Sequence, residues 1–255
     1  GSVSKAKSIY QLVLDILTQF KPCHLFIILQ AILQRHLDSI MTPELLAYLQ
    51  SLLTPRRREL FKKVLEQRTR HFTVVTEDVY QMHNTSAVMR SCDVFCIQDL
   101  HVIEARFGKR VDKEIAMGAQ KWVDIHRHSN AEDCLKQLRN KGYQIVATTP
   151  HDGVPLDAFD VSQKSALLFG TEKKGLSPEL MAQADVALTI PMYGFTESLN
   201  ISVSAAIILN ELVGRMRREH APWPLSDPER YDLECAWTVA TIKDAPRIIE
   251  RYHQD

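Results

Sequence analysis

The sequence predicts an α/β protein in which a mostly parallel sheet carries helices on both faces, with helical extensions at both ends. Three observations support this fold class. From His71 onward, short β-branched runs alternate with helical patterns, which is typical of parallel strands joined by helices. Before His71, apolar residues recur at helical spacing and glycine is absent from residues 2 to 107. After residue 220, a proline-rich linker leads into a last helical pattern.

The N-terminal extension is expected to be helical throughout. Its apolar residues recur at spacings of three and four, and Thr42-Pro43 and Thr54-Pro55 each place a capping hydroxyl before a proline at the first helical position. The predicted helices cover about residues 8–20, 24–37, 43–53 and 55–67.

The central part alternates strands with helices. The predicted strands are 72–79, 101–104, 122–125, 144–149, 166–169 and 186–190. Helices are expected between them at 85–95, 112–119, 131–141 and 177–183, followed by a long helix at 198–219 and a final helix at 228–251. We therefore divide the chain into a helical extension at 1–70, an α/β domain at 71–219, and a linker with a helix at 220–255.

Composition excludes several classes of protein. Of the 255 residues, 45% are hydrophobic and 24% are charged, so the bulk of the chain is not disordered. Lys and Arg (31) balance Asp and Glu (31), which excludes a globally basic nucleic-acid binder but leaves room for a local basic face. The five cysteines form no CxxC pair, so neither a disulfide framework nor a metal site is expected. Cys92 and Cys96 are interpreted as small buried residues on one helical face.

The chain shows no targeting signal. No stretch approaches the 20 or so apolar residues of a membrane span, and the N-terminus lacks the order of a signal peptide. With cysteine usage that fits a reducing compartment, this predicts a cytoplasmic protein without a membrane partner. Gly1-Ser2 resembles a cloning scar. Met41-Thr-Pro-Glu would make a natural start, so residues 3–40 are expected to be an added segment.

A local excess of positive charge lies just before the first strand. Residues 54–70 contain seven Lys or Arg and two Glu, a net charge of +5. A solvated helix face would explain this pattern, and so would a surface that contacts phosphates. The candidate phosphate contacts of this segment are Arg56, Arg57, Arg58, Lys62, Arg68 and Arg70, and Lys109 and Arg110 after the second predicted strand could add to them.

The usual nucleotide and metal motifs do not fit. No GxGxxG follows a strand, and Gly170 and Gly175 have P-loop spacing but are followed by Leu176 and Ser177 instead of Lys and Ser or Thr. We therefore exclude ATP or GTP binding at this loop. His126-Arg-His128 is interpreted as a loop and not as a ligand pair.

Three segments place polar groups at predicted strand ends and helix starts. They are Asn84-x5-Arg90, Phe169-Gly-x-Glu172-x2-Gly175, and Ile190-Pro-Met-x-Gly194-x3-Ser198-Leu-Asn200-Ile-Ser202. Each alone could be a helix cap or an ordinary strand-to-helix loop. Ligands of open α/β sheets bind beyond the carboxyl ends of strands, however, and here three such segments follow in order.

Together the three segments resemble motifs 1, 2 and 3 of the SpoU (TrmH) family of RNA 2′-O-ribose methyltransferases, over about residues 71–218. The departures are small: Cys96 stands where a glycine often follows the first motif, and Ile201 stands where Val is usual. The resemblance implies a C-terminal deep trefoil knot at about 167–204. It also implies a homodimer and S-adenosylmethionine as methyl donor, with S-adenosylhomocysteine as product and no metal.

The resemblance also implies which residues act. Arg90 would bind the adjacent phosphate and stabilise the developing alkoxide. It would not act as the base, because an arginine side chain stays protonated. The other implied catalytic residues are Asn84, Glu172, Ser198 and Asn200. The implied donor-binding residues are Thr148, Gly170, Ile190, Met192 and Leu199.

The helical ends favour tRNA as the substrate. A basic helix before the motifs and a helical tail after them resemble the family branch that methylates guanosine 18 in the tRNA D-loop. Three alternatives remain open: a ribosomal-RNA 2′-O-methyltransferase, an RNA-binding homologue that does not methylate, and a generic nucleotide-binding α/β domain.

Overall fold

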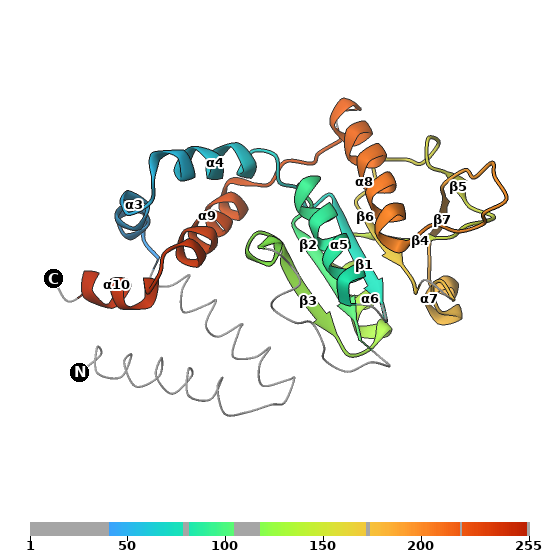
Figure 1. The fold of residues 1–255 in the computed structure, drawn as a ribbon, viewed down its shortest axis with the longest axis horizontal. Coiled ribbons are helices and arrows are strands. Elements are labelled where there is room, and N and C mark those ends of the chain that lie inside the picture. Colours follow the sequence, from blue (N-terminus) through green and yellow to red (C-terminus); the bar gives the residue numbers. More distant parts are fainter. Residues whose placement is uncertain (1–40, 79–81, 105–117, 172–173, 220, 254–255) are drawn as a thin grey trace. The chain divides into compact units, whose positions relative to one another are not determined.

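The computed structural model describes residues 41–78, 82–104, 118–171, 174–219 and 221–253 (Figure 1). These residues form two compact units, one of residues up to Thr54 together with those from Thr238 onward, the other from Pro55 to Trp237. In the smaller unit, the rings of Tyr48 on α3 (Pro43–Ser51) and Tyr252 on α10 (Ala245–Tyr252) lie 5.1 Å apart. The functional division at residues 70 and 219 stays a prediction.

One parallel sheet organises the larger unit, which confirms the predicted α/β fold with a parallel sheet. Within the described residues it has seven strands in the order β3-β2-β1-β6-β4-β7-β5, and every neighbouring pair is parallel. The strands are β1 (Phe72–Glu77), β2 (Asp99–Ile103), β3 (Asp124–His128), β4 (Gln144–Thr148), β5 (Val154–Pro155), β6 (Ser165–Phe169) and β7 (Val186–Thr189).

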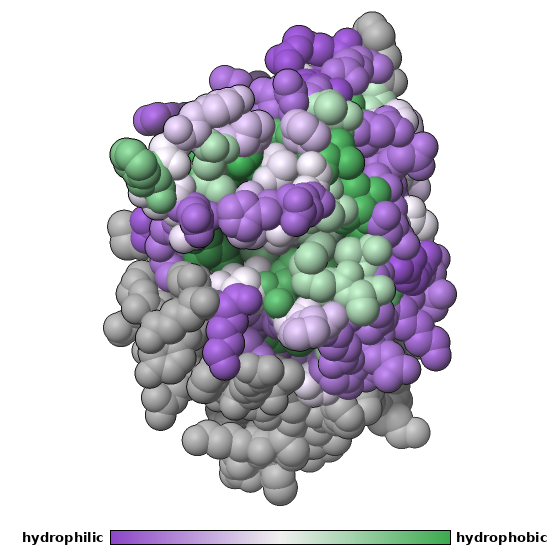
Figure 2. Space-filling model, turned by 90° about the vertical axis from the view of Figure 1, so that its right-hand side faces the viewer, coloured by the Kyte–Doolittle hydropathy of each residue, from purple (hydrophilic) through white to green (hydrophobic). Residues whose placement is uncertain are grey.

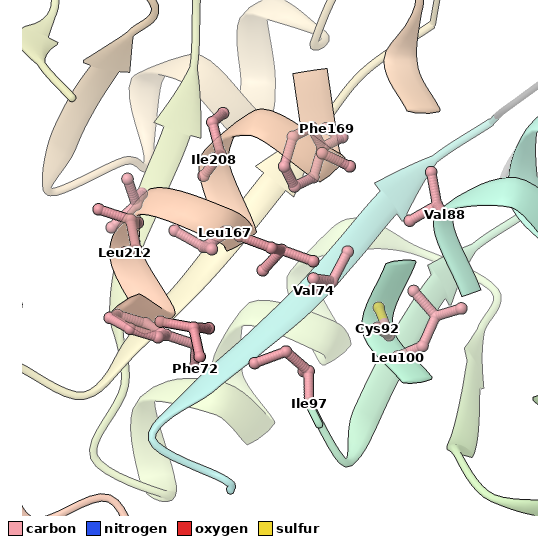
Figure 3. Close-up of a cluster of buried hydrophobic side chains, with 14 of the residues drawn as sticks. Phe72, Val74, Val88, Cys92, Ile97, Leu100, Leu167, Phe169, Ile208 and Leu212 are labelled. Carbon is pink, nitrogen blue, oxygen red and sulfur yellow. The ribbon is translucent and has the colours of Figure 1, made fainter. Parts of the chain in front are cut away.

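Both faces of the sheet are buried. Because successive side chains of a strand point to opposite faces, Val74 and Leu167 enter one core while Val75 and Leu168 enter the other. The first core is covered by α5 (Met82–Val94) and α8 (Ile201–Arg218), as Figure 3 shows for Val88, Cys92, Ile208 and Leu212. The second is covered by α6 (Ala131–Asn140) and α7 (Pro178–Ala182).

The remaining described helices are α4 (Pro55–Leu65), a 3-10 turn η1 (Ala119–Lys121) and α9 (Asp227–Thr241). Sequence capping signals explain several helix starts. The Thr42 hydroxyl accepts from the amide of Leu45 at 3.2 Å, and the Asn130 side chain accepts from the amide of Asp133 at 2.8 Å. In the described part of the chain, no helix has the length and apolarity that a bilayer span requires.

The structure differs from the predicted elements in three places, and some predicted helices lie outside the described residues. The final helix is two helices, because Pro246 has no amide hydrogen to continue α9 and Asp244 takes a left-handed backbone with φ of 58°. The two-residue strand β5 was not predicted. His126-Arg-His128 lies on strand β3 and not in a loop. Helix 112–119 lies almost wholly outside the described residues, as do the helices at 8–20 and 24–37.

Cys96 does not share a helical face with Cys92. It lies beyond the end of α5 with φ of 60°, the left-handed conformation in which α-helices commonly terminate. The Ile97 amide there donates to the Cys92 carbonyl at 2.8 Å. Glycine adopts this conformation without steric cost, which gives a physical reason for the glycine expected at this position.

We predict that Cys96→Gly stabilises the protein by roughly 0.5–1 kcal/mol, because it removes the steric cost of a left-handed non-glycine residue. Urea unfolding of the two proteins measures the difference. The control is Cys235→Gly, which places glycine inside α9 and should lower stability by about 1 kcal/mol. A loss of stability in Cys96→Gly would contradict the assignment.

Candidate active site

A cleft of about 330 Å³ opens at the carboxyl ends of β4, β6 and β7, beside the first turns of α8. Ligands of open α/β sheets bind at this edge. All residues expected to bind the donor line the cleft: Thr148, Gly170, Ile190, Met192 and Leu199. Of the residues expected to be catalytic, Ser198 lines it as well.

The walls of the cleft are largely apolar. Phe169, Leu188, Ile201 and Ile208 reach it from the first core, so its floor is rigid. The polar residues that line it are five Thr or Ser and one lysine, Lys174, and a small number of polar groups among apolar ones is typical of small-molecule sites. The Thr148 hydroxyl is itself fixed, since it donates to the Leu168 carbonyl at 2.7 Å.

The loop after β6 folds back on itself at one side of the cleft. Thr171 and Gly175 exchange two backbone hydrogen bonds of 2.9 Å, and Gly175 has φ of 65°. A Cβ at position 170 would lie 2.0 Å from the carbonyl carbon of Gly175. Both glycines of the second motif are therefore required by backbone geometry.

Glu77 at the end of β1 holds the far end of this loop. Its buried carboxylate accepts a 2.7 Å hydrogen bond from the amide of Ser177, the residue whose side chain caps α7. The sequence analysis missed Glu77. A carboxylate at the carboxyl end of a predicted strand is the signal that could have found it.

The third motif ends in a helix cap. The Asn200 side chain is the N-cap of α8 and accepts from the amide of Ser202 at 2.8 Å and from its hydroxyl at 2.7 Å. The predicted helix therefore begins three residues after Ser198. Ser198 stands in the exposed loop that precedes it, and Asn200 does not line the cleft.

The first motif lies on α5. Asn84 is buried within the helix and does not cap it, whereas Arg90 is exposed. Within the described residues, the Arg90 guanidinium makes no hydrogen bond or ion pair, so it is available to an anionic ligand. Neither residue lines the cleft. Glu172 lies outside the described residues.

The basic residues before β1 fall into two groups. Arg56, Arg57 and Lys62 are exposed on α4 and Arg58 is partly exposed, so they are accessible to RNA. Lys109 and Arg110 lie outside the described residues.

The structure gives Arg68 a structural role in place of the expected RNA contact, because its side chain is 1% exposed. It pairs with Asp93, donates to the Ile97 carbonyl at 3.2 Å and lies over the Trp237 ring.

Arg70 is likewise engaged inside the protein. Its guanidinium contacts Asp99 and Asp124 at 2.9 Å and Glu229 at 3.4 Å. Burial opposes its charge, but the three carboxylates raise its pKa above the ordinary value. A phosphate would have to displace these partners, so the structure does not present Arg70 to RNA.

Comparison with known proteins identifies the family. The SpoU rRNA Methylase family matches residues 71–210. The chain belongs to this family. The tRNA (guanosine(18)-2′-O)-methyltransferase of Borreliella burgdorferi is 34% identical over 189 residues, covering 74% of this chain and 87% of that protein. The enzyme of the same name from Thermus thermophilus is 36% identical, covering 71% and 94%.

Solved structures of SpoU methylases share the fold. The A. aeolicus TrmH/SpoU tRNA modifying enzyme has a TM-score of 0.65 at 33% identity, covering 74% of this chain and 98% of that chain. The SpoU methyltransferase AviRb from Streptomyces viridochromogenes, solved in complex with the cofactor AdoMet, has a TM-score of 0.54 at 25% identity, covering 60% and 62%.

We predict that Glu77→Leu loosens the start of α7. The substitution leaves the Ser177 amide without its acceptor, a loss of about 1–3 kcal/mol, so hydrogen exchange of residues 175–180 should accelerate roughly 10-fold or more. Hydrogen-exchange mass spectrometry measures this. Glu77→Gln keeps an acceptor oxygen and should exchange nearly as the parent does; equal acceleration in both variants would contradict the assigned role.

Proposed function

We propose that this SpoU methylase transfers a methyl group from S-adenosylmethionine to the 2′-hydroxyl of guanosine 18 in the D-loop of tRNA. The observation that carries the proposal is the cleft at the carboxyl ends of β4, β6 and β7, which brings together residues of the second and third motifs such as Gly170, Met192 and Ser198. The choice of tRNA is supported by relatives of that name that this chain matches over 87–94% of their length.

The cleft suits S-adenosylmethionine. Apolar walls from Phe169, Leu188 and Ile208 would hold an adenine ring, while loop backbone near Gly170 and Met192 offers hydrogen-bonding groups for its polar edges. When bound, this donor supplies a sulfonium methyl group that is already activated for transfer. The protein therefore has to orient the ribose hydroxyl and help its proton leave.

Arg90 is the residue we assign to the acceptor side. An arginine stays protonated at any physiological pH, so its role is electrostatic. Its guanidinium would bind the phosphate next to the ribose and stabilise the oxygen as it loses its proton. Ser198 and Asn200 would shape the donor side through the loop and the start of α8.

The chain between β6 and α8 is proposed to form the family's deep trefoil knot. Support comes from the two backbone hydrogen bonds between Thr171 and Gly175 and from the strand order, in which β6 and β7 flank β4 although they follow it in sequence. A knotted backbone would hold the cleft loops at fixed distances without any side-chain cross-link.

The protein is proposed to act as a homodimer. Large apolar side chains are exposed on α8 and on the loop before it: Tyr193, Phe195, Leu199, Val203 and Ile207. Figure 2 shows hydrophobic residues gathered on this side of the molecule among hydrophilic ones. A second copy packed here would remove this surface from water.

The RNA surface is proposed to include α4, with Arg56, Arg57, Arg58 and Lys62 as phosphate contacts. We place the protein and its tRNA substrate in the cytoplasm. The described cysteines are free thiols, which fits a reducing compartment.

The function is tested by methyl transfer from radiolabelled S-adenosylmethionine to three RNAs: an unmodified tRNA transcript, the same transcript with guanosine 18 replaced, and ribosomal RNA. Label on the first alone is expected. Label on ribosomal RNA alone would overturn the tRNA assignment, and absence of donor binding by calorimetry would overturn the methyltransferase assignment.

The same assay tests Arg90. Arg90→Ala should lower kcat roughly 100- to 1,000-fold while S-adenosylmethionine binding changes no more than a few-fold. Lys136→Ala, an exposed cation on α6, is the matched control and should leave the rate unchanged. A near-normal rate in Arg90→Ala would contradict its assigned role.

The role of α4 is tested by salt dependence of tRNA binding. In Arg56→Gln/Arg57→Gln, affinity should fall at low salt, and the slope of log K against log salt should shrink by about 0.7–0.9 for each phosphate that the protein no longer neutralises. The control Lys136→Gln/Lys141→Gln removes two exposed cations around α6 and should keep the parent slope. If both pairs behave alike, α4 is only a solvated face.

A further inference from the structure

A cluster of potential metal ligands lies away from the cleft, at the β3 side of the sheet. It contains His101 on β2, His128 on β3 and Cys134 on α6, which are 2%, 8% and 0% exposed. Their ligand atoms all lie within 4.8 Å of one another. Nδ1 of His101 and Nε2 of His128 share a hydrogen bond of 2.9 Å.

Strand register and helix packing bring these residues together. In the parallel pair β2–β3, His101 is opposite His126 and Ile103 is opposite His128, so the alternate residues His101 and His128 share one face. That face is covered by α6, whose buried residues are Ala131, Cys134, Leu135 and Leu138. The Asn130 cap fixes where α6 begins and so fixes the place of Cys134 one turn later.

Both imidazoles are in the form that binds metals. Burial, with His126 nearby, lowers the pKa of His101 to about 3 and that of His128 to about 4, so both are neutral at pH 7 and each has a lone pair. The Cys134 thiol has its pKa raised to about 12 by burial and is protonated without a cation.

The hydrogen bond between the histidines accounts for their pairing but not for the thiol beside both of them. A tetrahedral zinc ion with bonds of about 2.0–2.1 Å to nitrogen and 2.3 Å to sulfur needs ligand atoms roughly 3.3–3.8 Å apart. To reach this spacing, the two ring nitrogens would separate by a few tenths of an ångström from 2.9 Å, and the sulfur, which lies within 4.8 Å of both, would settle at about 3.6 Å from them.

We propose that His101, His128 and Cys134 form a zinc site that joins β2, β3 and α6. Nδ1 of His101, Nε2 of His128 and the Cys134 sulfur are the protein ligands, and water on the His128 side completes the tetrahedron. Zinc binding converts the thiol to a thiolate and releases one proton. The histidine that donates in the metal-free hydrogen bond moves its proton to its other ring nitrogen, so that Nε2 of His101 and Nδ1 of His128 carry the protons in the zinc-bound form.

The site would be structural and separate from methyl transfer. It lies on β2, β3 and α6, whereas the cleft is built on β4, β6, β7 and α8. Its effect would be to tie the β3 edge strand to the helix that covers it. At free zinc about 100 times the Kd, the thermal midpoint should rise by roughly 5–10 °C.

The test uses the full chain, stripped with a chelator and titrated with Co²⁺ and then Zn²⁺. One Co²⁺ per chain is expected, with a near-ultraviolet thiolate-to-cobalt band that Zn²⁺ bleaches and one proton released on binding. Cys134→Ala and His128→Gln should abolish the band. Cys92→Ala is the matched control, since Cys92 is equally buried on the opposite face of the sheet, and it should keep the band.

Absence of the band in the unaltered protein would overturn the proposal, and this result does not depend on whether any variant folds. A band that survives in Cys134→Ala, with the fold confirmed by circular dichroism, would also overturn it by assigning the metal to another thiol. Neither readout requires methyl transfer, so the zinc site and the proposed enzymatic function fail or stand separately.

Discussion

Parallel pairing of every strand is the constraint on which the rest of the molecule depends. A parallel strand cannot return through a tight hairpin, so each crossover needs a helix or a long loop, and these cover both faces of the sheet. The same constraint places the carboxyl ends of all strands at one edge of the sheet. The carboxyl ends of β1, β4, β6 and β7 therefore lie together, and Glu77, Thr148 and Gly170 come from one edge although they are far apart in sequence.

Within that edge, close backbone approach does more than side chains to shape the cleft. Gly170 lies against Gly175, and Glu77 holds the amide of Ser177 at 2.7 Å. Apart from Lys174, the polar residues that line the cleft are Thr and Ser, which are too common to be distinctive. This explains why no familiar nucleotide motif marks it, and why three separated segments together carry the recognisable pattern.

Local pattern was sufficient for much of the fold. Strands such as β1 and β6 are continuous apolar or β-branched runs, and the caps at Thr42 and Asn130 follow from side-chain chemistry. The strand β3 was harder, because His126 and His128 alternate with charged residues at the end of the sheet. The two residues of β5 are exposed and carry no periodic signal. The break before α10 does have a signal in the sequence, because Pro246 cannot continue a helix.

Long-range contacts were beyond local pattern. The Glu77–Ser177 bond joins residues 100 apart, and the histidine pair joins residues 27 apart, so both depend on strand order and register. Arg68 and Arg70 show the same limit: a run of basic residues looked uniform, yet burial separates those that face the core from those on α4.

The carboxylates around Arg70 have a consequence for how the molecule meets its substrate. Arg70 lies between α4 and β1, and its ion pairs fix this segment to three elements: to β2 through Asp99, to β3 through Asp124 and to α9 through Glu229. Under the role proposed for α4, its exposed arginines would follow a segment that is already fixed and would need little ordering on binding. Preorganisation of this kind lowers the conformational entropy that is lost on association. The positive charge of the helix would then act mainly by raising the association rate with a polyanion.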